Sequence, residues 1–273
     1  MSGILYVVAT PIGNLEDISA RALRTLREVD LIACEDTRRT RKLLDRYEIS
    51  KPLVSYHEHN EQARSQELLK ELAAGRNIAL VSDAGTPLIA DPGYRLVEEA
   101  RAQGIAVSPI PGPSAILAAL SASGLATDSF QFRGFLPAKT TQRRKVLEEL
   151  KGYDGTLVFY EAPHRILEAL EDIAAILGAR QVVLARELTK IHEEFLLGTP
   201  VELKTVLQAR PALKGEFTLM IGKSNGVEAD DTPVEEAVQK LIDAGASRMQ
   251  ALKTVARQRG LSKRDVYKQF DER

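Results

Sequence analysis

The chain has 273 residues, 44% hydrophobic and 27% charged, which excludes a wholly disordered, collagen-like or membrane-embedded protein. At roughly 100 to 200 residues per domain, this length favours two domains with a small appendage. Lys and Arg number 37 against 38 Asp and Glu, so at a net charge of −1 only local patches can attract nucleic acid. A single cysteine, Cys34, excludes an internal disulfide and a cysteine-built zinc site and is consistent with a reducing compartment.

The N-terminal segment has no basic stretch, and its apolar run over 4–9 stops at Thr10-Pro11, unlike a signal peptide. No run approaches the roughly eighteen apolar residues that a membrane span requires. We therefore expect a cytoplasmic protein that does not enter membranes.

The first half alternates short apolar runs with segments of helical period. We predict strands over 4–9, 31–34, 78–81 and 105–110, and helices over 18–29, 40–47, 95–102 and 114–123. Continuous apolar strands between helices are typical of a parallel sheet covered on both faces. The sequence therefore predicts an α/β domain over 1–112, which ends at the Pro-Gly-Pro run of 111–113.

The second half continues this alternation. We predict strands over 130–135, 157–160, 182–185 and 217–221, and helices over 141–150, 165–177 and 201–208. Segment 189–197 is compatible with a strand or a helix, and we favour a strand because Gly198-Thr199-Pro200 closes it quickly. These elements predict a second α/β domain over 113–226 with more antiparallel character.

An acidic, turn-rich stretch ending at Pro233 predicts a linker, and three helical patterns follow it over 234–244, 247–258 and 262–270. At each turn a glycine stop precedes a serine that can cap the next helix. Between Lys240 and Gln269 there are eight basic residues against two acidic ones. We therefore predict over 232–273 a basic, helix-turn-helix-like module that binds RNA, with a solvated helical face as the alternative.

Four turns rich in glycine and proline, at 10–14, 83–87, 91–93 and 111–114, stand out in the first domain. Three of them follow predicted strands directly, so in a parallel sheet they meet at the carboxyl edge, where such sheets bind ligands. The chain has no P-loop pattern and no G-x-G-x-x-G after its first strand, which argues against a P-loop nucleotidase or a standard dinucleotide enzyme. S-adenosylmethionine is compatible with such a pocket, because backbone groups can satisfy its nucleoside and amino-acid parts.

Two charged clusters follow strands of the second domain, at 161–165 and 186–190. The first is also compatible with a plain helix entry in which Pro163 is the first helical residue. The second is also compatible with an interdomain ion-pair network. His57-Glu58-His59 offers no third ligand at a recognisable spacing, so we expect a polar loop there and no metal.

Two basic runs bear on partners. One comprises Arg38, Arg39, Arg41, Lys42 and Arg46, and the other comprises Lys139, Arg143, Arg144 and Lys145. Together with the basic C-terminal helices they predict a positive rim that grips a phosphate backbone, although each run is also compatible with a solvated helix face. Aromatic residues make up only 5%, which favours structured RNA recognised by shape over base stacking.

These motifs together resemble those of the ribosomal RNA small-subunit methyltransferase I family. The resemblance covers roughly residues 4 to 223 and, more loosely, the helical tail. Besides the four turns, it rests on Glu35-Asp36-Thr37-Arg38, Gly134-Phe135-Leu136-Pro137, Pro163-His164-Arg165 and Arg186-Glu187-Leu188-Thr189-Lys190.

The resemblance implies the tetrapyrrole-methylase fold, with two α/β domains, a cleft between them, a small C-terminal helical module and a homodimeric assembly. It implies S-adenosylmethionine-dependent 2′-O-methylation of a decoding-site cytidine in 16S rRNA, either free or in the 30S subunit. Carried over by matching motif, the cofactor contacts are Pro11, Gly13, Asp83, Ala84, Gly85, Thr86, Ser114, Ala115, Tyr160, Glu161, Phe217 and Thr218. Alanine stands at 162 where serine is common in the family, which weakens any hydroxyl role there.

Methyl transfer to a ribose hydroxyl needs in-line positioning and a general base. Asp36, Asp83, Glu187 and Lys190 are candidate bases or orienting groups. We favour Glu187 as the base, with Lys190 and Arg165 holding the ribose-phosphate. Two alternatives stay open: a methylase of a tetrapyrrole precursor, which the basic tail argues against, and a non-enzymatic RNA-binding protein with a cofactor-like pocket.

Overall fold

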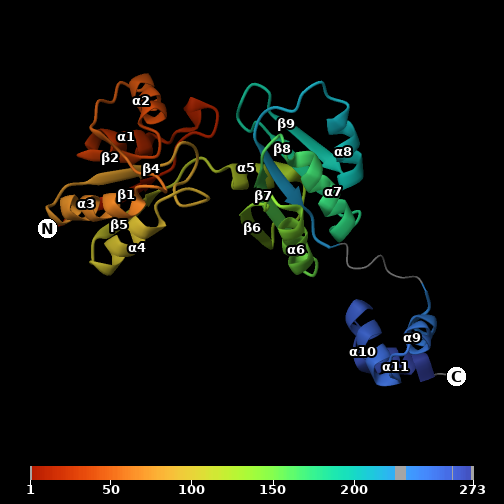
Figure 1. The fold of residues 1–273 in the computed structure, drawn as a ribbon. Coiled ribbons are helices and arrows are strands. Elements are labelled where there is room, and N and C mark those ends of the chain that lie inside the picture. Colours follow the sequence, from red (N-terminus) through yellow and green to blue (C-terminus); the bar gives the residue numbers. More distant parts are fainter. Residues whose placement is uncertain (1, 225–231, 260, 272–273) are drawn as a thin grey trace.

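The computed structural model describes residues 2–224, 232–259 and 261–271, which form two α/β units and a helical module (Figure 1). The first unit has a five-stranded sheet in the order β3-β2-β4-β1-β5, and every pairing in it is parallel. Its strands are β1 (Ile4–Val8), β2 (Leu31–Cys34), β3 (Leu53–Ser55), β4 (Ile78–Val81) and β5 (Ala106–Ile110). The prediction of a parallel sheet is confirmed.

Helices cover both faces of this sheet. Helices α1 (Ala20–Glu28) and α2 (Thr37–Arg46) pack on one face, where Ile32 and Cys34 point, and the short 3-10 helix η1 (Leu15–Asp17) precedes α1. Helices α3 (Glu61–Ala73) and α4 (Tyr94–Ala102) pack on the other face, against Leu5 and Ala33. Sequence reasoning missed β3 and α3, because β3 has only three residues and α3 carries its buried leucines among many charged residues.

The second unit has a mixed sheet in the order β6-β7-β10-β8-β9. Only β6 and β7 pair in parallel, which confirms the predicted antiparallel character. The strands are β6 (Phe130–Phe135), β7 (Thr156–Glu161), β8 (Val182–Arg186), β9 (Glu194–Gly198) and β10 (Phe217–Ile221). Helices α6 (Thr140–Leu150), α7 (Ile166–Leu177) and α8 (Pro200–Gln208) cover one face, and α5 (Ala115–Ser123) covers the other. The connection between the units therefore runs through 111–114.

One local expectation in this unit, and one of the alternatives left open, were wrong. Strand β9 begins at Glu194 and not at Thr189, because Glu187 and Thr189 adopt positive φ angles of 50° and 64° that no strand accommodates. Helix α7 begins at Ile166, so Pro163 lies in the turn that precedes the helix and is not its first residue.

The C-terminal module consists of α9 (Val234–Asp243), α10 (Arg248–Arg259) and α11 (Lys263–Asp271). It has its own apolar core, in which Val238, Ala251 and Val266 are fully buried. The Arg248 guanidinium lies 5.3 Å from the centroid of the Phe270 ring. Most of the predicted linker lies outside the described residues. No helix in the described part of the chain combines the length and apolarity that crossing a membrane would take.

Candidate active site

The turns that follow β1, β4 and β5 meet at the carboxyl edge of the first sheet. These strands are neighbours and run in the same direction. The backbone of Thr10 and that of Gly85 exchange two hydrogen bonds, of 2.9 and 3.0 Å, which join the turn after β1 to the turn after β4. The predicted convergence of turns distant in sequence is therefore confirmed.

A cavity of about 400 Å³ lies between these turns and the ends of β7 and β10 in the second unit, a volume within the usual range for a small-molecule site. Nine of the predicted cofactor contacts line it: Ala84, Gly85, Thr86, Ser114, Ala115, Tyr160, Glu161, Phe217 and Thr218. Residues from both units thus form one cavity, as the predicted cleft requires.

The other three predicted contacts lie elsewhere. Pro11 and Asp83 line a second, smaller hollow of about 140 Å³. Gly13 faces the second unit, where a Cβ atom on it would lie 2.5 Å from the Lys190 side chain and 2.7 Å from Thr189 Oγ1. The neighbouring Asn14 N–H donates to Thr189 Oγ1 at 3.0 Å. Gly13 therefore permits close packing between the units.

Sequence reasoning missed several cavity residues, among them Asp91, Phe135 and Glu216. Asp91 follows a tightly bent loop in which Leu88 and Ala90 have φ angles of 72° and 65°. Such angles are costly for residues with a side chain, and they cluster at functional sites. The only signal for Asp91 in the sequence was its place in the Asp-Pro-Gly turn of 91–93.

Two hydrogen bonds to one carboxylate oxygen, that of Glu61, fix the far end of this loop. The Gly93 N–H donates to Glu61 Oε1 at 3.2 Å, and the Tyr56 hydroxyl donates to the same oxygen at 3.0 Å. Tyr56 is 1% exposed, and Gly93 has a φ angle of 135° that favours glycine. The first residue of helix α3 therefore holds the end of the loop that carries Asp91.

The cavity is acidic. Asp91, Glu161 and Glu216 line it, and none of the described residues that line it is Lys or Arg. Glu161 is 2% exposed, and its Oε2 atom has no hydrogen-bond partner in the described structure. Burial raises the pKa of Glu161, and burial, aided by the charges of Glu35 and Asp83, raises the pKa of Asp91 to about 6. The cavity thus suits a ligand that brings positive charge and hydrogen-bond donors, and it disfavours phosphate.

Glu187 and Lys190, two of the predicted catalytic residues, form an ion pair beside the cavity. Lys190 Nζ lies 2.8 Å from Glu187 Oε1 and 3.0 Å from Glu216 Oε2. The hydrogen bond from Lys190 lowers the pKa of Glu187. Burial lowers the pKa of Lys190, but its bonds to Glu187 and Glu216 outweigh burial, and the net shift is upward. At neutral pH the pair is therefore a bound carboxylate and a bound ammonium.

Arg165 and Asp36, the other two candidates, also have partners. Arg165 donates to the Leu136 carbonyl, and its Nε lies 3.3 Å from Glu161 Oε1. Asp36 caps the start of α2 through the Arg38 N–H. Hydrogen bonds from the Arg38 side chain and backbone lower the pKa of Asp36 to about 2.

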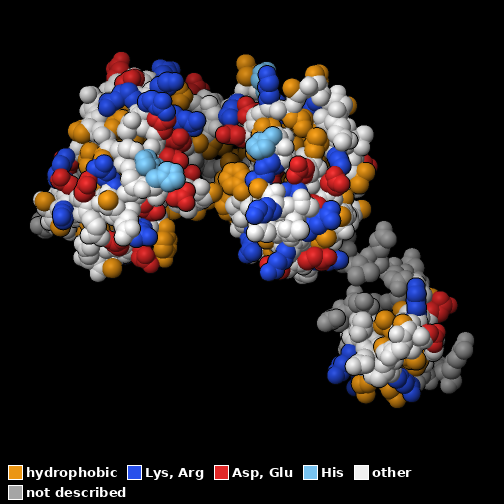
Figure 2. Space-filling model, viewed as in Figure 1, with side chains coloured by type: hydrophobic (Ala, Val, Ile, Leu, Met, Phe, Trp, Pro, Cys, Tyr) orange, Lys and Arg blue, Asp and Glu red, His pale blue; other side chains and the backbone are white. Residues whose placement is uncertain are grey.

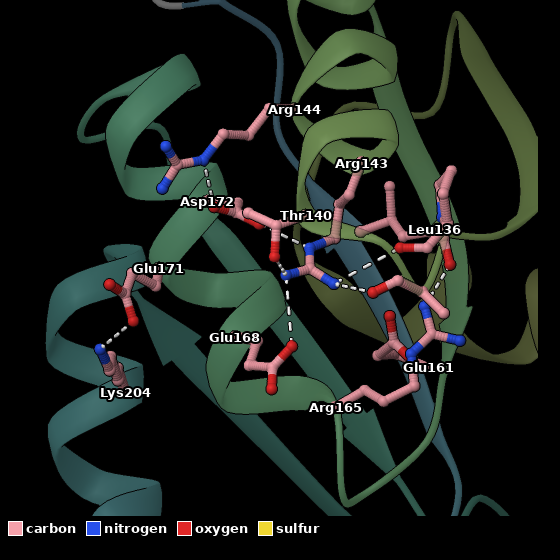
Figure 3. A network of polar contacts seen from close by, with 12 residues as sticks. Leu136, Thr140, Arg143, Arg144, Glu161, Arg165, Glu168, Glu171, Asp172 and Lys204 are labelled. Carbon is pink, nitrogen blue, oxygen red and sulfur yellow. Dashed lines mark hydrogen bonds and ion pairs between the residues drawn. The ribbon is translucent and has the colours of Figure 1, made fainter.

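A buried ion network supports the second unit's side of the cavity (Figure 3). Arg143 is 1% exposed, and its Nε lies 2.6 Å from Asp172 Oδ2. The same guanidinium donates to the carbonyls of Pro137 and Ala138 at 3.4 and 3.1 Å, which fixes the loop next to Phe135. The predicted rim is therefore wrong for Arg143, because this side chain points into the protein interior to meet a carboxylate on α7.

The fold and cavity define a class of protein. A family model described as Tetrapyrrole (Corrin/Porphyrin) Methylases matches residues 4–204. Among solved structures, diphthine synthase superposes with a TM-score of 0.63 at 18% identity, over 81% of this chain and 90% of its own. Uroporphyrin-III C-methyltransferase from Thermus thermophilus, complexed with S-adenyl homocysteine, superposes with a TM-score of 0.55 at 19% identity, over 81% of this chain and 97% of its own.

A closer relative narrows the class. Ribosomal RNA small subunit methyltransferase I of Halalkalibacterium halodurans is 53% identical over 273 aligned residues, which span 97% of this chain and 93% of the relative. The chain therefore belongs to the ribosomal RNA small subunit methyltransferase I family, as its motifs predicted.

Proposed function

We propose that the protein uses S-adenosylmethionine to methylate the ribose 2′-hydroxyl of a decoding-site cytidine in 16S rRNA. The observation that carries the proposal is the acidic cavity at the junction of the units, whose described lining holds three carboxylates and no Lys or Arg. A closely similar relative bears the name of a small-subunit rRNA methyltransferase, and a protein of the same fold is known in complex with S-adenyl homocysteine. We propose that this protein acts in the cytoplasm, where it would meet rRNA.

The residues of the cavity fit this methyl donor, which supplies an electrophilic methyl group when bound. The donor carries a sulfonium and an ammonium group, and carboxylates offset positive charge in a partly desolvated site. Glu161, with its unpaired Oε2, offers an acceptor for an N–H or O–H group. The turns at 84–86 and 114–115 offer backbone groups to the nucleoside and amino-acid parts.

The acceptor hydroxyl must lose a proton as the new carbon–oxygen bond forms, and three carboxylates compare as bases. Asp36 has a pKa of about 2, and Lys190 lowers the pKa of Glu187, so both are weak bases. Asp91 lines the cavity itself and has a pKa of about 6. We therefore prefer Asp91 over Glu187 as the base, and we assign Glu187 to holding Lys190 beside the cavity.

Positive charge outside the cavity supports RNA as the acceptor. Lys and Arg side chains gather over α1 and α2 of the first unit (Figure 2). The C-terminal module adds further basic residues on a separate core. This distribution favours rRNA over a tetrapyrrole precursor, because a large polyanion gains from dispersed cations that a small substrate cannot reach.

We also propose a homodimer. Three apolar side chains on or near β9 in the chain are exposed: Ile191 is 94% exposed, Val201 63% and Leu197 59%. Leu197 lies on β9, which is an edge strand of its sheet. Exposed apolar side chains on and near an edge strand favour association with a second copy.

The test is methylation of both free 16S rRNA and 30S subunits that lack the modification. Primer extension at low nucleotide concentration and mass spectrometry of nucleosides would locate the methyl group. We expect one 2′-O-methylcytidine at the decoding site. Methyl transfer to a base, or binding of S-adenosylmethionine without any transfer to RNA, would contradict the proposal.

A further inference from the structure

The smaller hollow lies directly beside the acidic cavity. Thr10, which lines the smaller hollow, pairs through its backbone with Gly85, which lines the cavity. The two spaces are thus separated by a single pair of bonded strand-end turns. Thr10 is 2% exposed, and its hydroxyl donates to the Ser82 carbonyl at 3.1 Å, so this partition is firmly held.

The charge of the smaller hollow is opposite to that of the cavity. Arg39 and Lys42 of α2 line it together with one carboxylate, that of Asp83. Residues three apart share one side of a helix, so both cations lie on the flank of α2 that faces the β1 turn. We call this space the α2 hollow.

Both cations of the α2 hollow can reach an incoming anion. Lys42 is exposed and makes no ion pair within the described residues. Arg39 Nη1 lies 3.2 Å from Asp83 Oδ2, but its side chain is 68% exposed. An ion pair exposed to this degree contributes little, so a stronger anionic partner can redirect the guanidinium at small cost.

We propose that the α2 hollow binds the phosphodiester group next to the target ribose and so sets that ribose at the mouth of the cavity. This proposal rests on the proposed function and adds the register of the RNA. The α2 hollow has a volume of about 140 Å³, which suits a phosphate group and not a whole nucleotide. A phosphate held by Arg39 and Lys42 is separated from the cavity only by the paired turns of Thr10 and Gly85. The acidic cavity repels that phosphate, so the contrast of charge fixes the orientation of the strand.

The first test compares Lys42→Gln with Lys70→Gln, a matched change on the exposed surface of α3, which covers the other face of the sheet. Lys42→Gln should raise the dissociation constant for a decoding-site RNA about fivefold and reduce the slope of log affinity against log salt by about 0.7 to 0.9. Calorimetry with S-adenosylmethionine should give the same affinity for wild type and both variants. Lys70→Gln should bind RNA like the wild type.

A second test removes the phosphate charge instead. RNA with a methylphosphonate linkage on the 5′ or the 3′ side of the target cytidine loses one phosphate charge at a known place. At the linkage that occupies the α2 hollow, Lys42→Gln should cause no further loss, whereas at the other linkage the fivefold loss should persist. A fivefold loss at both linkages would overturn the proposal.

The outcomes separate this inference from the proposed function. If the wild type methylates rRNA but Lys42→Gln binds RNA like Lys70→Gln, the α2 hollow is not a phosphate site and the function stands. If Lys42→Gln weakens S-adenosylmethionine binding instead, the hollow belongs to the donor and the proposal is wrong. If the wild type transfers no methyl group to rRNA, the proposed function itself fails.

Discussion

The two α/β units build opposite walls of the same cavity by different means. In the first unit, backbone groups shape the wall. Thr10 and Gly85 are hydrogen-bonded through their main chains, and the loop at Leu88 and Ala90 adopts positive φ angles. In the second unit, charged side chains hold the wall, through Arg143 with Asp172 and Lys190 with Glu187. The first wall should therefore be sensitive to changes of backbone shape, and the second to changes of charge.

The largest expected effect is in the second wall. Asp172→Asn removes the buried carboxylate that Arg143 contacts and leaves it only the exposed Glu168, 3.3 Å away, which should lower the free energy of unfolding by about 3–5 kcal/mol. Glu171→Gln is the control, because Glu171 is its sequence neighbour and pairs with Lys204 while 62% exposed. The control should cost less than about 1 kcal/mol. Urea unfolding measures both, and equal losses would show that burial of the pair does not matter.

The first wall carries the next effect, through Asp91. Asp91→Asn at saturating S-adenosylmethionine should reduce the single-turnover rate about a hundredfold, which is at the low end for loss of a general base. Because the pKa of Asp91 is raised to about 6, the wild-type rate should rise with pH through that value as the carboxylate forms. The variant should lose this rise. A variant within fivefold of wild type that keeps the rise would exclude Asp91 as the base.

The contact between the two walls at Gly13 should tolerate little added side-chain volume. In Gly13→Ala the new methyl group would lie 2.5 Å from the Lys190 side chain, which should cost about 1–3 kcal/mol as the units shift apart. Gly152→Ala is the control, because a Cβ atom there meets nothing within 4 Å. Gly13→Ala should change both the thermal unfolding temperature and the affinity for S-adenosylmethionine. Gly152→Ala should change neither.

The smallest expected effect separates two roles for Glu187. If Glu187 only holds Lys190, Glu187→Gln should slow single-turnover methylation less than tenfold, because the loss is that of one partly exposed ion pair. The pH dependence should stay that of the wild type. A hundredfold loss together with an altered pH dependence would return the role of base to Glu187.

The convergence of the turns was predictable from sequence because it depends on topology alone. Once the strands that end at Val8, Val81 and Ile110 are recognised as parallel neighbours, their following turns must share one edge. The two-domain division of cavity contacts, by contrast, came from motif resemblance. No local pattern shows that Tyr160 and Thr218 face those turns.

What sequence reasoning missed depends on contacts between distant residues. Arg143 lies in a run of basic residues and so resembles a surface cation, yet its partner Asp172 lies 29 residues away on the next helix. Similarly, nothing near Asp91 in the sequence reveals that Glu35, from the end of β2, shares its surroundings. Burial and long-range pairing, and not local propensity, decide both cases.

The acidity of the cavity has a consequence for turnover. Transfer of the methyl group turns a sulfonium into an uncharged thioether, so the spent donor has one positive charge fewer than the fresh one. The carboxylates of Asp91, Glu161 and Glu216 therefore attract the reactant more strongly than the by-product. Salt that screens these carboxylates removes this preference, so the by-product should compete better with the donor for the free enzyme, and product inhibition should strengthen, as ionic strength rises.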